Sequence, residues 1–384
     1  MKSKDLLALA VSFAVATIVF TEAATTLAIA AIAVLGYFVF YVRSRKAIAL
    51  TLSCGLSLIA FETIGSIVIR RAIARDYLPG RDHRMKPNPD KGINSDGILC
   101  DTEADAFADD AFNIIFLGDS FTFGLLLEDS NDAFPFQVER MIRARRPDLR
   151  ANCINFGWTS SSPLLSYRLL TEIGSKYKPD IVVFALDLTD FHDDLLYRHH
   201  DDPMERSASA FMLHKAGLYN FYLQLRQRWR LGRLWSGLHG ESLFIPDDRF
   251  FAVNQPLSLS QPYMLETEIQ LRKIADYCKS TLNAEFIVVF PPRSFQYSAV
   301  ECPDNWERHS YSVLGPFVRQ PFVWFDHFKA RVDFPCYSLL EALENAAEFP
   351  LFFRDDPHWT AAGHKVIAGA VMDILEKEGR LNSD

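Results

Sequence analysis

The 384-residue sequence has only six cysteines, no Cys-x-x-Cys pair and no excess of positive charge. Without paired cysteines a zinc ribbon is disfavoured. A formal net charge of −8 gives no basis for nucleic-acid binding, because phosphate contacts need a basic surface. Cys54 lies in an apolar run, which leaves an odd number of cysteines elsewhere, so these cannot all pair within one chain. A Cys302–Cys336 bond is compatible with the sequence but cannot be derived from spacing alone.

Charged residues are scarce in the first 70 positions, where apolar runs cover residues 6–20, 26–42 and 47–69. The first run fits either a signal peptide or a short membrane span, and the other two are long enough to cross a bilayer. The basic loop 43–46 between them is expected on the cytoplasmic side. We therefore predict two or three transmembrane helices in residues 1–70, membrane lipid as a partner, and a domain facing the periplasm or the cell exterior. Arg70, Arg71 and Arg75 argue against that orientation, because they follow the last run directly.

Residues 71–112 are polar and rich in turn-forming residues, which predicts a connector to the following domain. From residue 113 onward, apolar runs alternate with helical patterns. The expected strands are 113–117, 152–156, 181–187, 285–290 and a weaker one at 331–334, and the expected helices are 134–145, 163–176, 265–282 and 360–378. This alternation predicts an α/β fold, a doubly wound parallel sheet covered by helices on both faces. Ligands of such sheets bind beyond the carboxyl ends of the strands.

Residues 206–240 interrupt the alternation with six basic residues, interleaved aromatics and no acidic residue. A helical insertion of this kind can lie against anionic lipid or grip an acidic glycan. Alternatively, its aromatic side chains pack on the domain while its arginines are solvated, which is the commoner use of an amphipathic helix.

The tripeptide Gly118-Asp119-Ser120 follows the first expected strand directly. Gly118 allows a tight turn, and the side chain of Asp119 can fix the turn backbone. Ser120 would then present its hydroxyl at the carboxyl end of the strand, which makes it the candidate nucleophile. No Gly-x-Ser-x-Gly elbow surrounds this serine, so an α/β-hydrolase is disfavoured.

A serine nucleophile needs a base and a group that orients the base. Asp355 and His358 stand three residues apart in a loop before the last expected helix, and a short loop can bring the carboxylate to one ring nitrogen. Oxyanion donors are expected at two further strand ends, where Gly157 and Thr189 follow their strands.

These residues resemble the motifs of the GDSL/SGNH hydrolase family over residues 113–375. The first block matches Gly118-Asp119-Ser120, the second matches Gly157 after Asn155, and the fifth, Asp-x-x-His, matches Asp355 and His358. The resemblance implies a flavodoxin-like domain over residues 113–384 with a Ser120–His358–Asp355 triad. It also implies an oxyanion hole formed by the backbone amides of Ser120 and Gly157, with Asp119, Asn155 and Asp190 in support, and neither metal nor cofactor.

The third block departs from the family pattern, because Leu188-Thr189-Asp190 replaces Gly-x-Asn-Asp. We predict that the Thr189 hydroxyl replaces the missing asparagine as an oxyanion donor. The histidine and aspartate clusters at 191–194 and 198–202 could suggest a metal site, but further ligands cannot be placed. We expect a solvated loop there.

The sequence supports three hypotheses about function. The first is a membrane-anchored serine esterase, and the resemblance implies acyl groups, such as O-acetyl, on a cell-surface or exported glycan as its substrate. The second is an O-acyltransferase, in which a sugar hydroxyl instead of water resolves the same acyl-enzyme. The third is a weakly active or non-catalytic assembly or binding subunit that keeps the fold.

Overall fold

The computed structural model describes residues 84–108, 110–197, 246 and 248–381. The predicted transmembrane region 1–70 and the basic insertion 206–240 lie outside the described residues, as does the cluster 198–202. Within the described ranges, no helix has both the length and the hydropathy that a membrane span requires.

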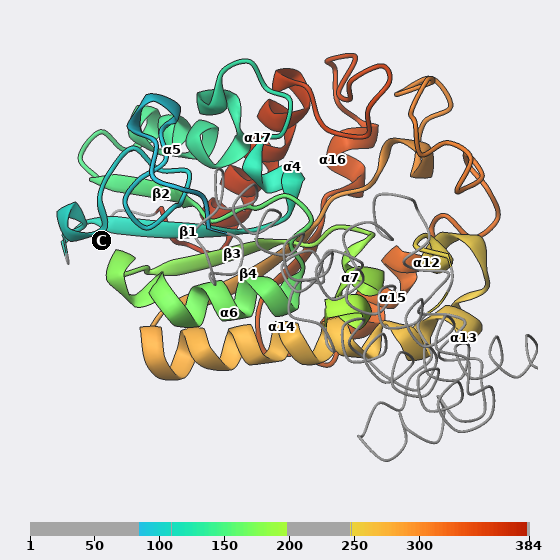
Figure 1. The fold of residues 1–384 in the computed structure, drawn as a ribbon, viewed down its shortest axis with the longest axis horizontal. Helices are drawn as coiled ribbons and strands as arrows, with labels where there is room; N and C mark the ends of the chain where they lie inside the picture. The colour runs from blue at the N-terminus through green and yellow to red at the C-terminus, as the bar shows by residue number, and fades with distance from the viewer. Residues whose placement is uncertain (1–83, 109, 198–245, 247, 382–384) are drawn as a thin grey trace, which may run out of the picture. The chain divides into compact units, whose positions relative to one another are not determined.

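The described chain forms a five-stranded parallel sheet in the order β2-β1-β3-β4-β5 (Figure 1). The strands are β1 (Phe112–Gly118), β2 (Ala151–Asn155), β3 (Ile181–Ala185), β4 (Glu285–Phe290) and β5 (Cys336–Ser338). The predicted α/β architecture with a parallel sheet is confirmed. The chain passes from β1 to β2 on one side and then to β3 on the other, so the strand order reverses next to β1.

Apart from Asn113 and Glu285 near their starts, the central strands β1, β3 and β4 consist of apolar residues and glycine, because both of their faces are covered. In β1, Ile115 and Leu117 belong to one core, while Ile114 and Phe116 belong to the other, and all four side chains are fully buried. Continuous burial of this kind is the reason why parallel strands appear in a sequence as unbroken apolar runs.

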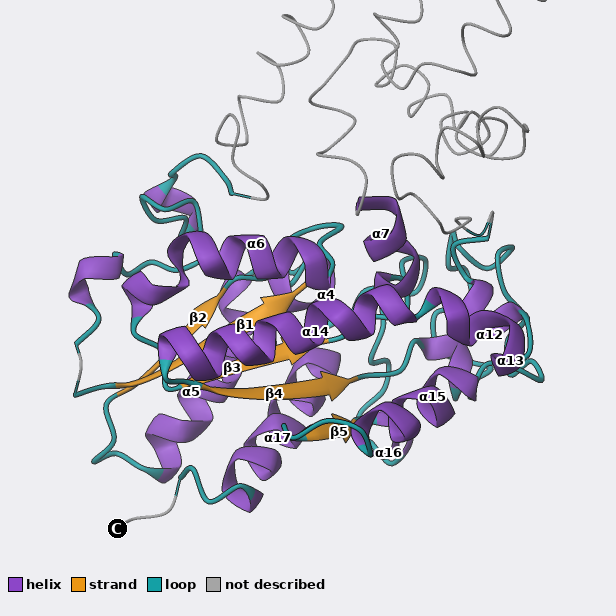
Figure 2. Ribbon diagram, turned by 90° about the horizontal axis from the view of Figure 1, so that it is seen from below, coloured by secondary structure: helices purple, strands orange, loops and turns teal. Residues whose placement is uncertain are grey.

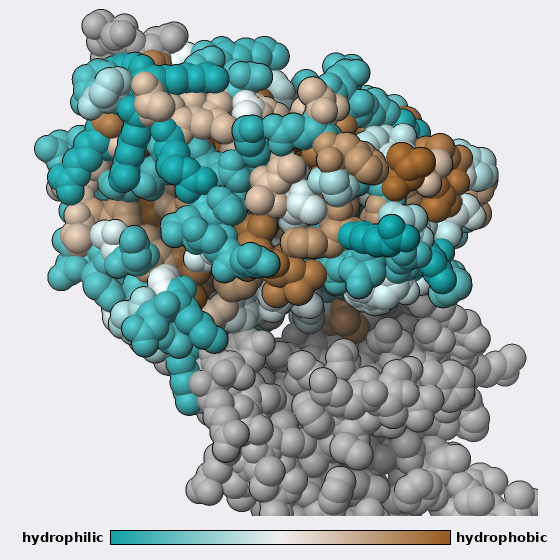
Figure 3. Space-filling model, turned by 90° about the horizontal axis from the view of Figure 1, so that it is seen from above, coloured by the Kyte–Doolittle hydropathy of each residue, from teal (hydrophilic) through white to brown (hydrophobic). Residues whose placement is uncertain are grey.

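Helices cover both faces of the sheet (Figure 2). One face carries α6 (Pro163–Ile173), α7 (Asp190–Tyr197), α12 (Phe251–Asn254), α14 (Leu265–Tyr277) and α15 (Gln320–Lys329). The other carries α5 (Phe134–Arg145), α16 (Leu340–Glu344) and α17 (Ala361–Lys377). Two four-residue helices, α4 (Ser120–Phe123) and α13 (Leu257–Ser260), complete the set of α-helices in the described ranges. The surface in Figure 3 is hydrophilic over most of the described part, with apolar side chains in small groups.

Three predicted segments differ from the structure. The last strand is β5, later than the predicted 331–334. Residues 84–108 of the predicted connector pack on the domain, where Ile98 and Phe107 join one core and the Asn94 amide donates to Tyr177 Oη at 2.8 Å. Residues 191–194, predicted as a solvated loop, are buried in α7, because their carboxylates bind partners inside the domain.

Candidate active site

Ser120 lies where β1 gives way to α4, at the carboxyl end of the sheet. Gly118 has a φ of 151°, and a Cβ there would come within 2.2 Å of Thr122 Oγ1, so only glycine fits. Asp119 caps α4, accepting a hydrogen bond from the Phe121 amide at 2.9 Å. The turn chemistry predicted for Gly118 and Asp119 is therefore present, and it makes Ser120 the first residue of the helix.

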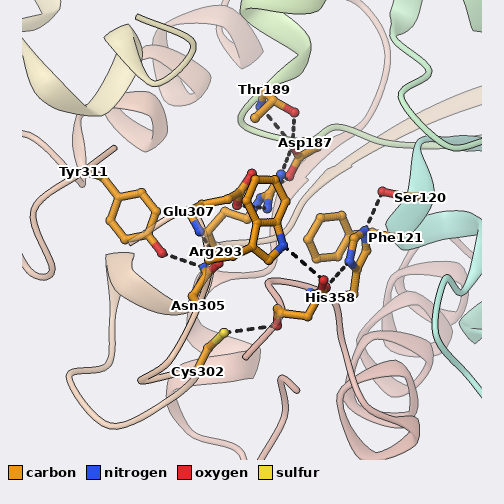
Figure 4. A network of polar contacts seen from close by, with 12 residues as sticks. Ser120, Phe121, Asp187, Thr189, Arg293, Cys302, Asn305, Glu307, Tyr311 and His358 are labelled. Atoms are coloured by element: carbon orange, nitrogen blue, oxygen red, sulfur yellow. Dashed lines mark hydrogen bonds and ion pairs between the residues drawn. The ribbon is translucent and has the colours of Figure 1, made fainter. Parts of the chain in front are cut away.

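The hydroxyl of Ser120 faces the ring of His358 (Figure 4). Ser120 Oγ and His358 Nε2 are 2.7 Å apart, although the two residues are 238 positions apart in the sequence. The other ring nitrogen, Nδ1, contacts a carboxylate of Asp356. A carboxylate only accepts hydrogen bonds, so Nδ1 carries the proton and Nε2 has the lone pair that can accept the serine proton. The predicted pairing of Ser120 with His358 is present.

The carboxylate on His358 belongs to Asp356, whereas the Asp-x-x-His motif predicts Asp355 in this role. Asp356 Oδ1 also accepts from the His358 backbone amide at 3.1 Å. The side chain of Asp355 is exposed. Its backbone oxygen accepts a hydrogen bond from the Trp306 amide at 3.3 Å. Residues 354–358 form a bend, in which the Asp356 carboxylate contacts the ring while the side chain of Asp355 lies in solvent.

Aromatic rings hold the imidazole in place. Phe121 packs on His358 with the ring centroids 4.7 Å apart, and Trp359 packs edge-on against Phe121 at 4.8 Å. Burial in this apolar surrounding lowers the pKa of His358, the Asp356 hydrogen bond raises it, and the charge of Arg293 lowers it; the net shift is downward from 6.5. Although its own burial raises the pKa of Asp356, its hydrogen bonds with His358 hold that pKa below the ordinary value. At neutral pH the pair is therefore a carboxylate beside a neutral base.

The lowered pKa of His358 predicts the pH dependence of any reaction in which it acts as base. A base with a pKa below 6.5 stays unprotonated, and competent, until the pH falls through that lowered value. We expect the acidic limb of the kcat/KM profile on 4-nitrophenyl acetate to have its midpoint below pH 6.5. A midpoint above pH 6.5, in protein shown by circular dichroism to stay folded, would contradict this prediction.

Asn155 joins the second strand end to the nucleophile turn. Its amide donates to Thr122 O at 2.9 Å, and its side-chain oxygen accepts from the Gly157 amide at 2.9 Å. A Cβ on Gly157 would come within 2.4 Å of the backbone nitrogen of Phe123, so glycine is required by the close approach of α4. The Gly157 N–H, a predicted oxyanion donor, thus already donates to the Asn155 side-chain oxygen. An oxyanion would have to compete with that oxygen for the same N–H.

Thr189 does not provide the oxyanion donor predicted for it. Its hydroxyl donates to Asp187 Oδ2 at 2.6 Å, and its backbone amide donates to the same oxygen at 2.9 Å. A threonine hydroxyl has one proton, so the group cannot donate to an oxyanion at the same time. The reason is the carboxylate two residues earlier, which closes a tight turn around Thr189.

Arg293, which belongs to none of the predicted motifs, links the segments around the site (Figure 4). It follows β4 and is almost fully buried. Its Nε and Nη2 donate to the two oxygens of Asp187 at 2.7 and 2.6 Å, and Nη1 donates to Glu307 at 3.3 Å. The guanidinium also lies 4.4 Å from the ring centroid of Phe121. Its position beyond the carboxyl end of a strand is the signal that could have identified it.

Asp119, Asn155 and Asp190, predicted to support the site, each fix a turn. Asp190 Oδ2 accepts from the Asp187 amide at 2.9 Å. Burial raises the pKa of Asp119 and of Asp190 well above the ordinary value, and neighbouring carboxylates raise both further. The Ser120 amide stays a predicted oxyanion donor: it is the first N–H of α4, and such groups have no acceptor within the helix.

The described cysteines and acidic side chains show no further reactive centre. Cys100, Cys153, Cys278, Cys302 and Cys336 are all free thiols, so the Cys302–Cys336 bond is absent. Among the described residues, no group of three or more histidine, cysteine, aspartate or glutamate side chains is arranged to hold a metal ion. Asp193 instead pairs with Arg249, and Asp194 accepts from the Leu164 amide and from Thr267.

No family model and no curated protein matches the sequence. Among solved structures, the chain is similar to a two-domain esterase (CEX) active on acetylated mannans, with 16% identity over 71% of this chain and 50% of the other, and a TM-score of 0.38. A putative lipolytic protein of the G-D-S-L family from Desulfitobacterium hafniense DCB-2 gives 12% identity, 68% and 99% coverage and a TM-score of 0.37. A putative arylesterase from Agrobacterium tumefaciens str. C58 gives 12% identity, 69% and 99% coverage and a TM-score of 0.38. The chain spans about half the length of the first of these, and scores this low assign neither activity nor substrate to it.

Proposed function

We propose that the chain is a serine ester hydrolase of the SGNH type. The observation that carries the proposal is the chain of contacts from Ser120 Oγ to His358 Nε2 at 2.7 Å and from His358 Nδ1 to Asp356. A nucleophile, a neutral base and an orienting carboxylate in this order are what acyl transfer to serine requires. The triad therefore consists of Ser120, His358 and Asp356.

The geometry supports a two-step reaction. Ser120 Oγ attacks the ester carbonyl while its proton passes to His358 Nε2, and the same proton then goes to the departing alkoxide oxygen as the ester bond breaks. Water, deprotonated by His358, attacks the acyl-enzyme; as the bond between the acyl carbon and Ser120 Oγ breaks, His358 returns this proton to Ser120 Oγ and the carboxylic acid is released. Asp356 stabilises the imidazolium during both steps, and the Ser120 amide donates to the oxyanion.

The family resemblance supports a glycan-linked acyl ester, such as an O-acetyl group, as the substrate. The apolar runs before residue 70 support membrane anchoring, with the domain outside the cytoplasm. A protease-accessibility test on intact cells checks the second proposal, because a domain on the outer side is cleaved without lysis. Survival of the domain until the cells are lysed would overturn that orientation.

A second candidate function is a weakly active protein that binds acylated ligands on this fold. The observation that favours it is the engagement of two predicted oxyanion donors by other acceptors, Thr189 by Asp187 and Gly157 by Asn155. Loss of one oxyanion donor lowers turnover by about 10²–10³. Such a protein would still acylate slowly at Ser120.

Labelling with a fluorophosphonate probe tests the proposed function. We expect stoichiometric labelling of the full chain and none in Ser120→Ala, because the probe needs an activated serine. In the same variant, hydrolysis of 4-nitrophenyl acetate should fall by roughly 10³-fold or more. Ser280→Ala is the matched control, since its hydroxyl is exposed and donates to Asp276 O at 2.6 Å. Equal labelling of wild type and Ser120→Ala would refute the proposal; labelling with negligible turnover would favour the second candidate.

A further inference from the structure

Trp306 is an exposed aromatic side chain in direct contact with the triad. Its side chain is 64% exposed, which is unusual for tryptophan. The indole Nε1 donates to Asp356 Oδ2 at 3.1 Å, the carboxylate oxygen not used by the His358 ring. An indole whose N–H is fixed and whose faces remain in solvent offers a flat apolar surface next to the reacting groups.

The loop that carries Trp306 is bonded to the loop that carries the triad acid and base. Asp304 N donates to Arg354 O at 3.0 Å, and Trp306 N donates to Asp355 O at 3.3 Å. Cys302 Sγ donates to Asp356 O at 3.0 Å. On its buried side, the loop is anchored by Glu307, which accepts from Arg293. The indole is thus held in place before any ligand arrives, which reduces the entropy lost on binding.

The side chains next to Trp306 in these loops are polar and charged. Asp304 pairs with Arg354 at 2.7 Å and with Arg308 at 3.6 Å; the side chains of Asp304 and Arg308 are about half exposed, and that of Arg354 is mostly exposed. Asp304, Arg308 and Arg354 offer charged hydrogen-bonding groups beside the ring, and an acyl chain has no groups that could use them. A sugar ring differs from an acyl chain here: its C–H face packs on an aromatic face, and its hydroxyl groups need hydrogen-bonding partners around it.

We infer that Trp306 is the platform on which the sugar ring bearing the ester stacks, and that the charged side chains around it bind the sugar hydroxyls. The inference rests on the proposed function and names its substrate class, an acylated carbohydrate. The contact with Asp356 fixes the platform relative to Ser120 and His358, so a ring stacked there brings its ester groups toward the nucleophile.

Binding of an acetylated manno-oligosaccharide to full-length Ser120→Ala protein tests the platform without depending on turnover. We expect calorimetry to show that the further change Trp306→Ala weakens binding by about tenfold, which corresponds to about 1.4 kcal/mol. Trp306→Phe, which keeps a ring but loses the N–H, should weaken it by threefold at most. Phe349→Ala is the matched control, because that ring is similarly exposed at 65% and has no group that can donate to Asp356. Equal binding with and without the Trp306→Ala change, or no binding in either case, would overturn the inference.

Kinetics in the chain with Ser120 intact separate this inference from the proposed function. With methyl acetate, which has no ring, Trp306→Phe and Trp306→Ala should lower kcat equally and leave KM unchanged, because both lose the hydrogen bond to Asp356. With the acetylated oligosaccharide, only Trp306→Ala should also raise KM. An equal rise of KM with methyl hexanoate would instead assign the platform to the acyl chain and overturn the inference. If wild type hydrolyses none of these esters, the proposed function fails, while the calorimetric result still decides the sugar site.

Discussion

Replacing Asp356 by asparagine is expected to lower kcat by roughly 10³- to 10⁴-fold on 4-nitrophenyl acetate. The carboxylate of Asp356 holds the proton on His358 Nδ1 and thereby leaves Nε2 free to accept the proton of Ser120. An asparagine amide can donate to Nδ1, which favours the other tautomer and places a proton where the base needs a lone pair. The side chain is only partly buried, so the fold should survive the change.

Asp355→Asn is the matched control for this prediction. It changes the same charge one position earlier, in a side chain that is exposed, and should alter kcat by less than about twofold, as expected for a surface change without a catalytic contact. A large loss in Asp355→Asn with little effect of Asp356→Asn would restore the assignment made from sequence spacing. Circular dichroism of both variants excludes unfolding as the cause.

Replacing Arg293 by methionine is expected to lower the free energy of unfolding by about 3–5 kcal/mol. The guanidinium is buried and bound to Asp187 and Glu307, so its removal leaves the buried Asp187 carboxylate without a counter-charge and leaves Glu307 with Arg249, 3.9 Å away. Methionine keeps much of the length but has no donor. Urea unfolding of the full chain, followed by tryptophan fluorescence, measures the change. Arg319→Met is the control, because Arg319 pairs with Glu344 in solvent, where such pairs contribute about 0–1 kcal/mol.

The same variant should show a changed pH dependence of stability. Burial raises the pKa of Asp187, but Arg293 and Thr189 lower it more, from 3.8 to about 2. A carboxyl with a lowered folded-state pKa stabilises the protein above its ordinary pKa, and this stabilisation is lost as the pH falls through about 2. Without Arg293, burial raises the pKa of Asp187, so acid relieves the cost of the unpaired charge. The stability difference between wild type and Arg293→Met should therefore shrink from pH 7 to pH 4; a constant difference would contradict the assigned role.

The strands and helices of the domain were predictable where burial is complete. The run ending at Gly118 and the strand Glu285–Phe290 are apolar because helices cover both sides, and this leaves a clear pattern in the sequence. The last strand was misplaced because β5 is three residues long, partly exposed and paired on one side only, so no apolar run marks it. The sequence predicts a connector over residues 84–108, because their buried side chains, such as Ile98, are separated by turns and show no periodicity.

The site was predictable at the level of loops and less so at the level of side chains. The positions of the strand ends and the motif spacing correctly predict that Ser120 and His358 lie in contact. The motif spacing does not show whether Asp355 or Asp356 contacts His358, because this depends on the backbone conformation of the loop. Thr189 was assigned to the oxyanion by its position alone, and its engagement with Asp187 is a contact that spacing does not reveal. Trp306 carries no motif, and its contact with Asp356 depends on the pairing of two loops about 50 residues apart.

The pairing of these two loops has a consequence for how such an enzyme could be redesigned or could diverge. In many hydrolases the loops that choose the substrate vary freely around an unchanged catalytic core. Here one hydrogen bond joins Trp306 to Asp356, the acid of the proposed triad, so under the proposed function a substitution at this position should alter substrate preference and reaction rate together. Directed evolution toward a new ester should therefore proceed through paired changes at 306 and in the loop 354–358, and variants changed at 306 alone should lose activity on every ester.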